Sequence, residues 1–342
     1  MTIMTVGLDL AKSVFHVVCF NERSKEVKKC MLRRSQVLQF FVPLPPCRIG
    51  MEACASSHYW GRELSALGHD VKLIPPQYVK PYLRGNKNDY NDARAIAEAA
   101  IRPSMSFVAI KTVDEQDMQA LHRMRSNCLK DRTALSNSTR GLLGEYGIVL
   151  SKGLTTLRKS IPRLLEDAEN ALSDRFRNLL ARRYEQLVEL DEHIAFYTKE
   201  LELLSRQDDA CKRLQTIPGF GPIVSSAFRS AIGDGHAYAC GRDVAASVGL
   251  VPRQYSSGGK NVLLGISKRG DRYLRGLLVH GARAVVAQAA KKEDSLSRWI
   301  NRISKERGRN KAVVALANKM ARIGWAILSK NTYYQPASQQ PV

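Results

Sequence analysis

The sequence predicts an α/β domain with a mixed sheet, followed by a helical region and a basic, mostly helical C-terminal part. Strand-like and helix-like runs alternate over the first 110 residues, and helical, charge-balanced sequence follows to residue 210. The remaining residues carry most of the excess positive charge. We therefore expect domains at 1–110, 111–210 and 211–330, and a disordered tail at 331–342.

The elements of the first domain are predicted from short apolar runs. The strands are predicted at 5–10, 14–20, 48–53 and 69–75, and the helices at 57–68 and 92–101. Gly68 ends the first helix and Pro103 follows the second. A shorter helix or helix-to-loop segment is expected at VLQFFVPL. The order β-β-β-α-β-α predicts a layered domain with a mixed sheet.

The middle region contains one stripe of apolar residues at helical spacing. Its members are separated by steps of 3-4-3-4-3, with charged residues on the other faces of the helix. They are Leu187, Leu190, Ile194, Tyr197, Leu201 and Leu204. The stripe fits a short coiled coil, between chains or within one, and equally an amphipathic helix packed on its own domain.

The C-terminal part opens with LQTIPGFGPIVSSAFRSAIG at 214–233, which predicts a helix, a PGFG turn and a second helix. In a helix-hairpin-helix the turn glycines let backbone N–H groups approach a phosphate at the start of the second helix. A helical hairpin that binds no ligand can use the same kind of turn. The PGFG turn lies in the basic third of the chain, which favours the nucleic-acid interpretation.

The charge of the chain points to a polyanionic partner. The 342 residues carry a formal net charge of +21, and residues 211–342 contain 22 Lys/Arg against 6 Asp/Glu. A one-sided surplus costs self-repulsion that mixed charge avoids, which disfavours a merely solvated basic face. Nucleic acid is the first candidate partner, and an acidic membrane surface is the rival.

The sequence also indicates the compartment. No apolar run approaches the roughly 20 residues of a membrane span, and Asp9 and Lys12 interrupt the only apolar stretch at the N-terminus, so no signal peptide is expected. Seven cysteines are scattered without a CxxC pair. This usage favours a reduced, cytoplasmic protein and argues against structural zinc.

Four acidic residues occupy places where acids are unexpected. Asp9 lies within the apolar run GLDLA, and Glu52 closes the apolar run IGMEA. Asp89 and Asp92 stand at spacing i, i+3 at the start of a predicted helix, which projects both to one side and favours their charge. Singly, each fits a turn, an ion pair or an N-cap.

Together, the four acids suggest a metal centre. Two strand-borne and two helix-borne carboxylates in a small α/β domain supply the oxygen ligands that Mg²⁺ prefers. One or two such ions would promote attack on a phosphodiester. A basic protein with this site is a candidate nucleic-acid-cutting enzyme.

A second cluster lies in SVGLVPRQYSSGGKNVLLGISKRGDRYLRGLL at 247–278. Ser256 and Ser257 precede a Gly-Gly-Lys segment that suggests a flexible basic loop, where a serine is either a nucleophile or a turn and phosphate-binding residue. Lys268 to Arg275 follow at helix-like spacing. The expected phosphate contacts are Arg253, Lys260, Lys268, Arg269, Arg272 and Arg275.

Five motifs together resemble a known family. They are GLDLAK (7–12), GMEACASSHYW (50–60), NKNDYNDARAIAEA (86–99), TIPGFGPIVSSAF (216–228) and VGLVPRQYSSGGK (248–260). The chain resembles the DEDD transposases of bacterial insertion sequences, of the RNA-guided bridge-recombinase kind ("IS-one-ten" type), and within it the "IS-eleven-eleven" subgroup. The order and spacing match along most of residues 5–330.

The resemblance implies an N-terminal RuvC-like domain of RNase H type that binds Mg²⁺ through Asp9, Glu52, Asp89 and Asp92. It implies a coiled coil that joins subunits into a dimer or tetramer, and a C-terminal domain whose Ser257 forms a covalent phosphoserine link with DNA. Ser256 is the alternative nucleophile. The implied partners are the DNA of element ends and target and a structured guide RNA encoded by the element, in the bacterial cytoplasm at the nucleoid.

Other functions remain open at this stage. An RNase H-like nuclease such as a junction resolvase would use water instead of Ser257. A non-catalytic nucleic-acid-binding protein would use the basic residues alone, and an actin-like phosphotransferase shares only the GLDLAK start. For a transposase, the carboxylates and the serine would meet across domains or subunits in a composite site.

Overall fold

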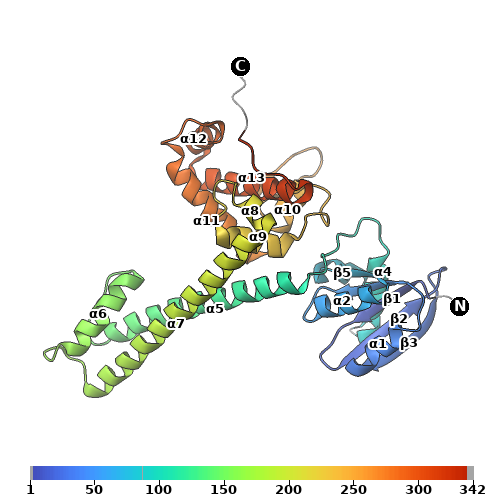
Figure 1. Cartoon of the computed structure of the whole chain (residues 1–342), viewed down its shortest axis with the longest axis horizontal. Coiled ribbons are helices and arrows are strands. Elements are labelled where there is room, and N and C mark those ends of the chain that lie inside the picture. The colour runs from blue at the N-terminus through green and yellow to red at the C-terminus, as the bar shows by residue number, and fades with distance from the viewer. Residues whose placement is uncertain (1–2, 87, 337–342) are drawn as a thin grey trace. The chain divides into compact units, whose positions relative to one another are not determined.

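The computed structural model describes residues 3–86 and 88–336 (Figure 1). The chain forms two compact units. One contains the residues up to Gln116 with Arg229–Arg275 and Val314–Thr332, and the other contains Asp117–Phe228 and Gly276–Val313 with the residues from Tyr333 onward. The domain limits expected near residues 110 and 210 remain predictions, and the part of the expected tail at 337–342 lies outside the described residues.

A five-stranded mixed sheet forms the centre of the N-terminal region, as the alternating pattern predicts. The strand order is β3-β2-β1-β4-β5. The β1–β2 and β2–β3 pairs are antiparallel, and the β1–β4 and β4–β5 pairs are parallel. The strands are β1 (Thr5–Asp9), β2 (Val14–Phe20), β3 (Glu26–Arg33), β4 (Arg48–Glu52) and β5 (Asp70–Ile74).

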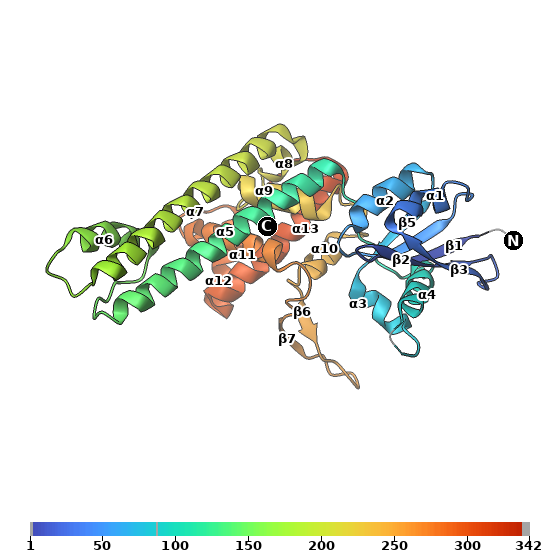
Figure 2. The same cartoon turned by 90° about the horizontal axis from the view of Figure 1, so that it is seen from below.

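One face of this sheet carries the hydrophobic core. Because side chains alternate along a strand, Val6 and Leu8 of β1 share a face with Ile49 and Met51 of β4, and all four are buried. Helices α1 (Val37–Phe41) and α2 (Ser57–Ala66) cover this face after the short 3₁₀ helix η1 (Arg34–Gln36). Figure 2 shows α2 and α4 on opposite faces of the sheet.

The other face is covered by α4 (Asp89–Ala100), which follows α3 (Pro76–Val79) and the 3₁₀ helix η2 (Lys80–Tyr82). The helix approaches closely because the strands present glycine there. A Cβ on Gly7 would lie 1.8 Å from the Ala93 carbonyl oxygen, and one on Gly50 would lie 2.8 Å from the Ala100 Cβ. The two strands therefore hold the helix backbone near the sheet.

The predicted order of elements lacked one strand. β3 was not predicted, because charged residues interrupt the apolar residues of EVKKCMLR and the strand forms an edge of the sheet with most side chains outside the core. Its pairing with β2, from Val14 opposite Arg33 onward, makes it a strand. The other four predicted strands are present within one residue at each end.

Three helices follow: α5 (Val113–Gly144), α6 (Leu154–Glu166) and α7 (Asp174–Gln207). Part of α5 lies along α7 (Figures 1 and 2), where Arg132 donates to Asp191 at 2.6 Å and Arg125 donates to Thr198 at 2.7 Å. Of the predicted apolar stripe on α7, every seventh residue is buried, namely Leu187, Ile194 and Leu201. Coiled-coil pairing between chains stays a prediction.

The C-terminal elements are mostly helical and include one β-hairpin. They are α8 (Asp209–Leu214), α9 (Pro222–Ile232), α10 (Gly241–Ser247), β6 (Pro252–Gln254), β7 (Leu263–Ile266), α11 (Arg272–Ala289), α12 (Ser295–Arg307) and α13 (Arg309–Lys330). Helices α8 and α9 flank the PGFG turn, and the helix-hairpin-helix function of that turn stays a prediction.

Helix α13 is the one described helix long and apolar enough, by length and composition alone, to cross a membrane. Half of its apolar window is buried inside the structure, as in the core helix of a folded domain. It is weak evidence for a membrane segment.

Candidate carboxylate site and serine hairpin

The sheet places two acids on the face that α4 covers. In the parallel β1–β4 pair, Gly7 is the partner of Gly50 and Leu8 is the partner of Met51. Asp9 and Glu52 stand two residues beyond the glycines, so both point to the side of α4. The glycines bring the helix onto this face, and the acids follow where the strands end.

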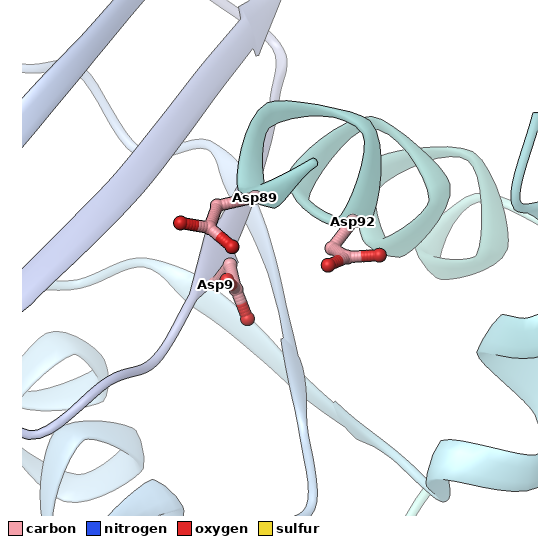
Figure 3. Close-up of side chains that lie close together, drawn as sticks. All are labelled: Asp9, Asp89 and Asp92. Carbon is pink, nitrogen blue, oxygen red and sulfur yellow. The ribbon is translucent and has the colours of Figure 1, made fainter. Parts of the chain in front are cut away.

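The first turn of α4 supplies two more acids. Asn88 caps the helix, its side chain accepting a hydrogen bond from the Tyr90 backbone N–H at 2.9 Å. Asp89 and Asp92 lie in the first turn, where the helix dipole stabilises negative charge. Figure 3 shows both side chains projecting from this turn beside Asp9, at the end of β1.

The three aspartates form one cluster. A carboxylate oxygen from each of Asp9, Asp89 and Asp92 lies within 4.8 Å of the others. Glu52 is not part of this close group, but Asp9 and Asp92 are near enough to act on its charge. The structure thus brings the predicted acids to one place, three in mutual reach and the fourth at the margin.

The cluster is electrostatically unfavourable without a cation. Burial, followed by the charges of Asp92 and Asp89, raises the pKa of Asp9, and His16 opposes the shift. Burial, followed by Asp9 and Asp92, raises the pKa of Glu52, and Lys80 opposes it. A group of hard oxygen donors that repel one another matches the ligand chemistry of a divalent cation such as Mg²⁺.

His16 is a neighbour of the cluster that was not predicted. It is the register partner of Asp9 across β1–β2, and its Nδ1 lies 3.5 Å from Asp89 Oδ2. The ring packs edge-to-face on Tyr90, with centroids 4.8 Å apart. The alternation of VFHVVCF places His16 outside the core, but only the strand register sets it opposite Asp9.

Cys54 borders the same acids. Burial, followed by the charges of Glu52 and Asp9, raises the pKa of its thiol. A thiol held in its protonated form is a poor nucleophile. Cys54 is therefore a neighbour of the carboxylate site without nucleophilic character of its own.

Ser257 lies at the tip of the β6–β7 hairpin. Gly258 and Gly259, with φ of 55° and 78°, form the two central positions of a tight turn, and the Lys260 N–H donates to the Ser257 carbonyl at 3.0 Å. The Ser-Gly-Gly-Lys segment is thus the turn of a β-hairpin, which was not predicted, and the flexibility expected for this loop stays a prediction. The strands are too short and too exposed to show a strand pattern in the sequence.

The two adjacent serines differ in their hydrogen bonds. The Ser256 hydroxyl accepts from the Val262 N–H at 3.3 Å and from Gln254 Nε2 at 3.0 Å. Within the part of the chain that the structure describes, no hydrogen bond involves the Ser257 hydroxyl. Ser256 thus helps to close the hairpin, while Ser257 is exposed at its tip.

The predicted phosphate-binding residues surround this hairpin. Arg253 lies on β6, Lys260 lies at the tip, and Arg272 is the first residue of α11. Lys268 has a φ of 55° and Arg269 is next to it, so these two precede the helix and the expected helical spacing from residue 268 was wrong. These five side chains are exposed.

Arg275 has a different environment. It is half-buried, and its guanidinium donates to the Val248 carbonyl at 2.9 Å and to the Arg269 carbonyl at 3.2 Å. These bonds tie α11 to the base of the hairpin. That Arg275 also contacts phosphate stays a prediction, and the same guanidinium would then serve both roles.

Two family models match the chain. One, the DEDD model of the IS110 type with the description "Transposase", matches residues 6–148. The other, described as "Transposase IS116/IS110/IS902 family", matches residues 211–298. The first segment contains the four carboxylates, and the second contains the serine hairpin.

Curated relatives match over nearly their whole length. The transposase for insertion sequence element IS1111A of Coxiella burnetii is 42% identical over 97% of this chain and 92% of its own. The chain belongs to the IS116/IS110/IS902 family of transposases. The transposase for element IS1328 of Yersinia enterocolitica is 40% identical, covering 96% of this chain and 98% of its own. A Pseudomonas aeruginosa protein named "Probable family 20 transposase" is 46% identical over 98% and 100%.

The family membership makes this chain an insertion-sequence transposase, for which DNA is the substrate. The transposase has a carboxylate cluster in its N-terminal sheet region and an exposed serine, Ser257, on the β6–β7 hairpin. Their joint use in one reaction is a question of mechanism.

Proposed function

We propose that this transposase cuts and rejoins DNA strands with a Mg²⁺-binding carboxylate site and with Ser257 as the nucleophile, under the guidance of a structured RNA encoded by the element. The observation that carries the proposal is the convergence of Asp9, Asp89 and Asp92 within 4.8 Å. These acids come from a strand end and a helix start and have no common structural task that would require their mutual repulsion.

The donor set supports Mg²⁺ as the cation. Mg²⁺ is bound in proteins by a few carboxylates together with water and substrate phosphates. The Asp89 side chain is 59% exposed, which leaves room for such further ligands. Bound there, a divalent cation neutralises charge at a scissile phosphate and activates the attacking oxygen.

The chain's own residues have distinct tasks in this reaction. Asp9 and Glu52 fix the site to the sheet, and Asp89 and Asp92 close it from α4. The Ser257 Oγ forms a bond to phosphorus while the bond from phosphorus to the leaving sugar oxygen breaks. The serine proton goes to a base and the sugar oxygen gains a proton, so the phosphodiester bond is exchanged for a phosphoserine bond and can be re-formed.

The hydrogen bonds of the hairpin favour Ser257 over Ser256 as the nucleophile. The Ser256 hydroxyl accepts hydrogen bonds from Gln254 and Val262 within the hairpin, whereas Ser257 is exposed on its turn. Five exposed cations nearby, at 253, 260, 268, 269 and 272, would hold the DNA backbone without reading its sequence. This division assigns target choice to the guide RNA.

Assembly forms part of the proposal. The carboxylates and Ser257 would work together in a composite site formed between domains or subunits of a homo-oligomer, with α7 joining the subunits and the PGFG turn contacting phosphate. Adding a Cβ to Gly221 in that turn would meet nothing within 4 Å, so its backbone is accessible to a ligand. Coupling of cutting to assembly would protect the genome from unrepaired breaks.

The decisive experiment looks for the covalent intermediate. The transposase is incubated with DNA carrying an element junction, with the element's RNA and with Mg²⁺, and is then denatured and resolved by electrophoresis. We expect a protein–DNA adduct that vanishes in Ser257→Ala, persists in Ser256→Ala and is absent in Asp92→Asn, although Asp92→Asn still binds nucleic acid. Cutting without any adduct would identify a nuclease that uses water.

A mixing experiment tests the composite site. Subunits with Asp9→Ala and subunits with Ser257→Ala, each inactive alone, should recover part of the cleavage when combined. No recovery at any ratio would show that each subunit needs both groups. Omission of the RNA should abolish cleavage at the target, and unaltered cleavage without it would remove guidance from the proposal.

A further inference from the structure

A pocket lies at the end of the sheet where β1 ends, on the face that α1 and α2 cover, and has no role in the reaction described above. Its volume is about 700 Å³, within the range of pockets that hold small ligands. Three cations, a hydroxyl and two aromatic rings line much of it, from Lys12, Ser13, Arg33, Arg34, Tyr59 and Trp60. All of these residues belong to the same N-terminal sheet and to the elements that cover its core face.

The cations of the pocket are held on well-defined backbone. Lys12 and Ser13 form the turn between β1 and β2, and Val14 is the register partner of Arg33 at the end of β3. The Arg34 N–H donates to the Ser13 carbonyl at 3.0 Å, which joins the two segments. Within the described ranges 3–86 and 88–336, no ion pair involves Lys12, Arg33 or Arg34, so their charge is uncompensated.

The aromatic wall is fixed in orientation. The Trp60 ring packs edge-to-face between Phe15 at 5.2 Å and Tyr59 at 5.1 Å, and the Arg34 guanidinium lies 5.1 Å from its centroid. Tyr59 is 39% exposed, which leaves ring surface for a ligand. The indole Nε1 of Trp60 is buried and has no hydrogen-bond partner among the described residues. A buried donor of this kind is costly unless a ligand or rearrangement satisfies it.

The pocket and the acids lie at the same end of the sheet, where β1 ends, but on opposite faces: the pocket on the side of α1 and α2, the acids on the side of α4. Lys12 follows Asp9 by three residues, and a chain of three residues spans at most about 11 Å. Tyr59 and Trp60 lie in α2, the helix that follows Glu52. A strand bound at the carboxylates would reach the pocket round this end of the sheet within a few nucleotides, since adjacent nucleotides of one strand rise by about 3.4 Å in a duplex.

We propose that this pocket binds an unstacked nucleotide of the DNA strand next to the phosphate that is cut. Uncompensated cations beside exposed aromatic and guanidinium planes are the chemistry that binds single-stranded nucleic acid, with phosphate on the cations and base on the planes. A protein partner would leave three desolvated cations unpaired unless it were acidic. DNA is the assigned source because the pocket lies at the same end of the sheet as the acids proposed to act on DNA, and in this respect the inference rests on the proposed function.

Binding to short oligonucleotides tests the pocket. The probe is an oligothymidylate with one central 2-aminopurine, whose fluorescence is quenched when it stacks on an aromatic ring, and the full chain is titrated into it without divalent cation. We expect the native chain to quench the probe, and Arg34→Gln and Tyr59→Ala each to weaken binding by about five- to 150-fold and to abolish the quenching. Tyr59→Phe should retain both, because it keeps the ring.

The matched control is Arg23→Gln. Arg23 is also an exposed arginine, but it lies in the turn between β2 and β3 at the opposite end of the sheet. It should leave the quenching intact. Equal losses in Arg23→Gln and Arg34→Gln would reduce the effect to overall charge and overturn the pocket, as would unchanged binding in Arg34→Gln and Tyr59→Ala.

Two further results separate the alternatives. The same sequence as RNA is titrated in parallel, and dependence on Arg34 and Tyr59 for RNA alone would overturn the assignment to the cut DNA strand. Arg34 and Tyr59 are both exposed, so each variant is expected to fold, and thermal melting verifies this. Because no cation is present, binding is measured apart from cleavage, and failure of the carboxylate chemistry would appear only in the cleavage assay with Asp92→Asn.

Discussion

Asp9 and His16 are register partners across the β1–β2 pair, and the His16 imidazole reaches on to Asp89 at 3.5 Å. One histidine thus contacts the helix-borne part of the carboxylate cluster from the strand next to Asp9. Groups that orient a metal ligand in this way are needed for affinity although they do not touch the metal.

Replacement of His16 should therefore weaken the site. We expect His16→Ala to lower cation affinity or strand cleavage by about 10- to 100-fold, measured by titration with Mg²⁺ or Mn²⁺. His236→Ala is the control, because His236 makes a similar contact of 3.4 Å with Asp234 on an exposed surface. Equal effects of the two variants would contradict a positioning role.

Asp9→Asn should change stability and activity in opposite directions. Burial and the neighbouring aspartates raise the pKa of Asp9, so the folded state favours the protonated carboxyl and the ionised form opposes folding. The stability of the fold that comes from the protonated carboxyl is therefore lost as pH rises through the raised pKa. The amide of Asn resembles the protonated acid. At neutral pH with chelator we expect a melting temperature higher by a few degrees, and no cleavage with Mg²⁺.

Added cation provides the complementary measurement. A ligand that binds only the folded state raises the melting temperature with concentration, so Mg²⁺ or Mn²⁺ should stabilise the native chain and should do so much less in Asp9→Asn. If Asp9→Asn in the presence of chelator had a lower melting temperature than the native chain, repulsion among the carboxylates would not limit the stability of the fold.

Gly7→Ala should separate α4 from the sheet. The new Cβ would lie 1.8 Å from a backbone oxygen of Ala93, which cannot move without the helix. We expect a loss of about 1–3 kcal/mol or more in urea unfolding, with weaker cation binding because Asp89 and Asp92 move with the helix. The control is Gly141→Ala in α5, where no atom lies within 4 Å and a gain of about 0.5–1 kcal/mol is expected.

Arg272 and Arg275 should fail in different assays. Arg272 is exposed at the start of α11, so Arg272→Ala should weaken DNA binding and reduce the slope of log affinity against log salt by about 1. Arg275→Ala removes the bonds to the Val248 and Arg269 carbonyls and should mainly lower the melting temperature. An unchanged salt slope in Arg272→Ala would show that this arginine does not contact phosphate.

Much of the N-terminal fold could be predicted from the sequence, because four of its five strands are marked by apolar runs. These strands are β1, β2, β4 and β5, and acids within or at the end of such runs identified Asp9 and Glu52. β3 could not be predicted, since charged residues interrupt its apolar ones and only Leu32 of its eight residues is buried.

The parts of the site that depend on pairing were beyond the sequence. His16 gains its role from the register that sets it opposite Asp9, and nothing in VFHVVCF specifies that partner. The pocket joins Lys12, Arg33 and Trp60 from three segments that meet only after the sheet forms. The turn at Gly258 and Gly259 was missed because its strands have three and four residues.

The β6–β7 ribbon has a consequence for when the transposase reacts. Every residue from Pro252 to Gly265 is exposed, and a two-stranded ribbon gains little order from its own contacts. On the proposed function, whatever the ribbon docks on would supply much of its rigidity, and the Ser257 hydroxyl would react only in that assembly. An isolated subunit would then leave DNA intact.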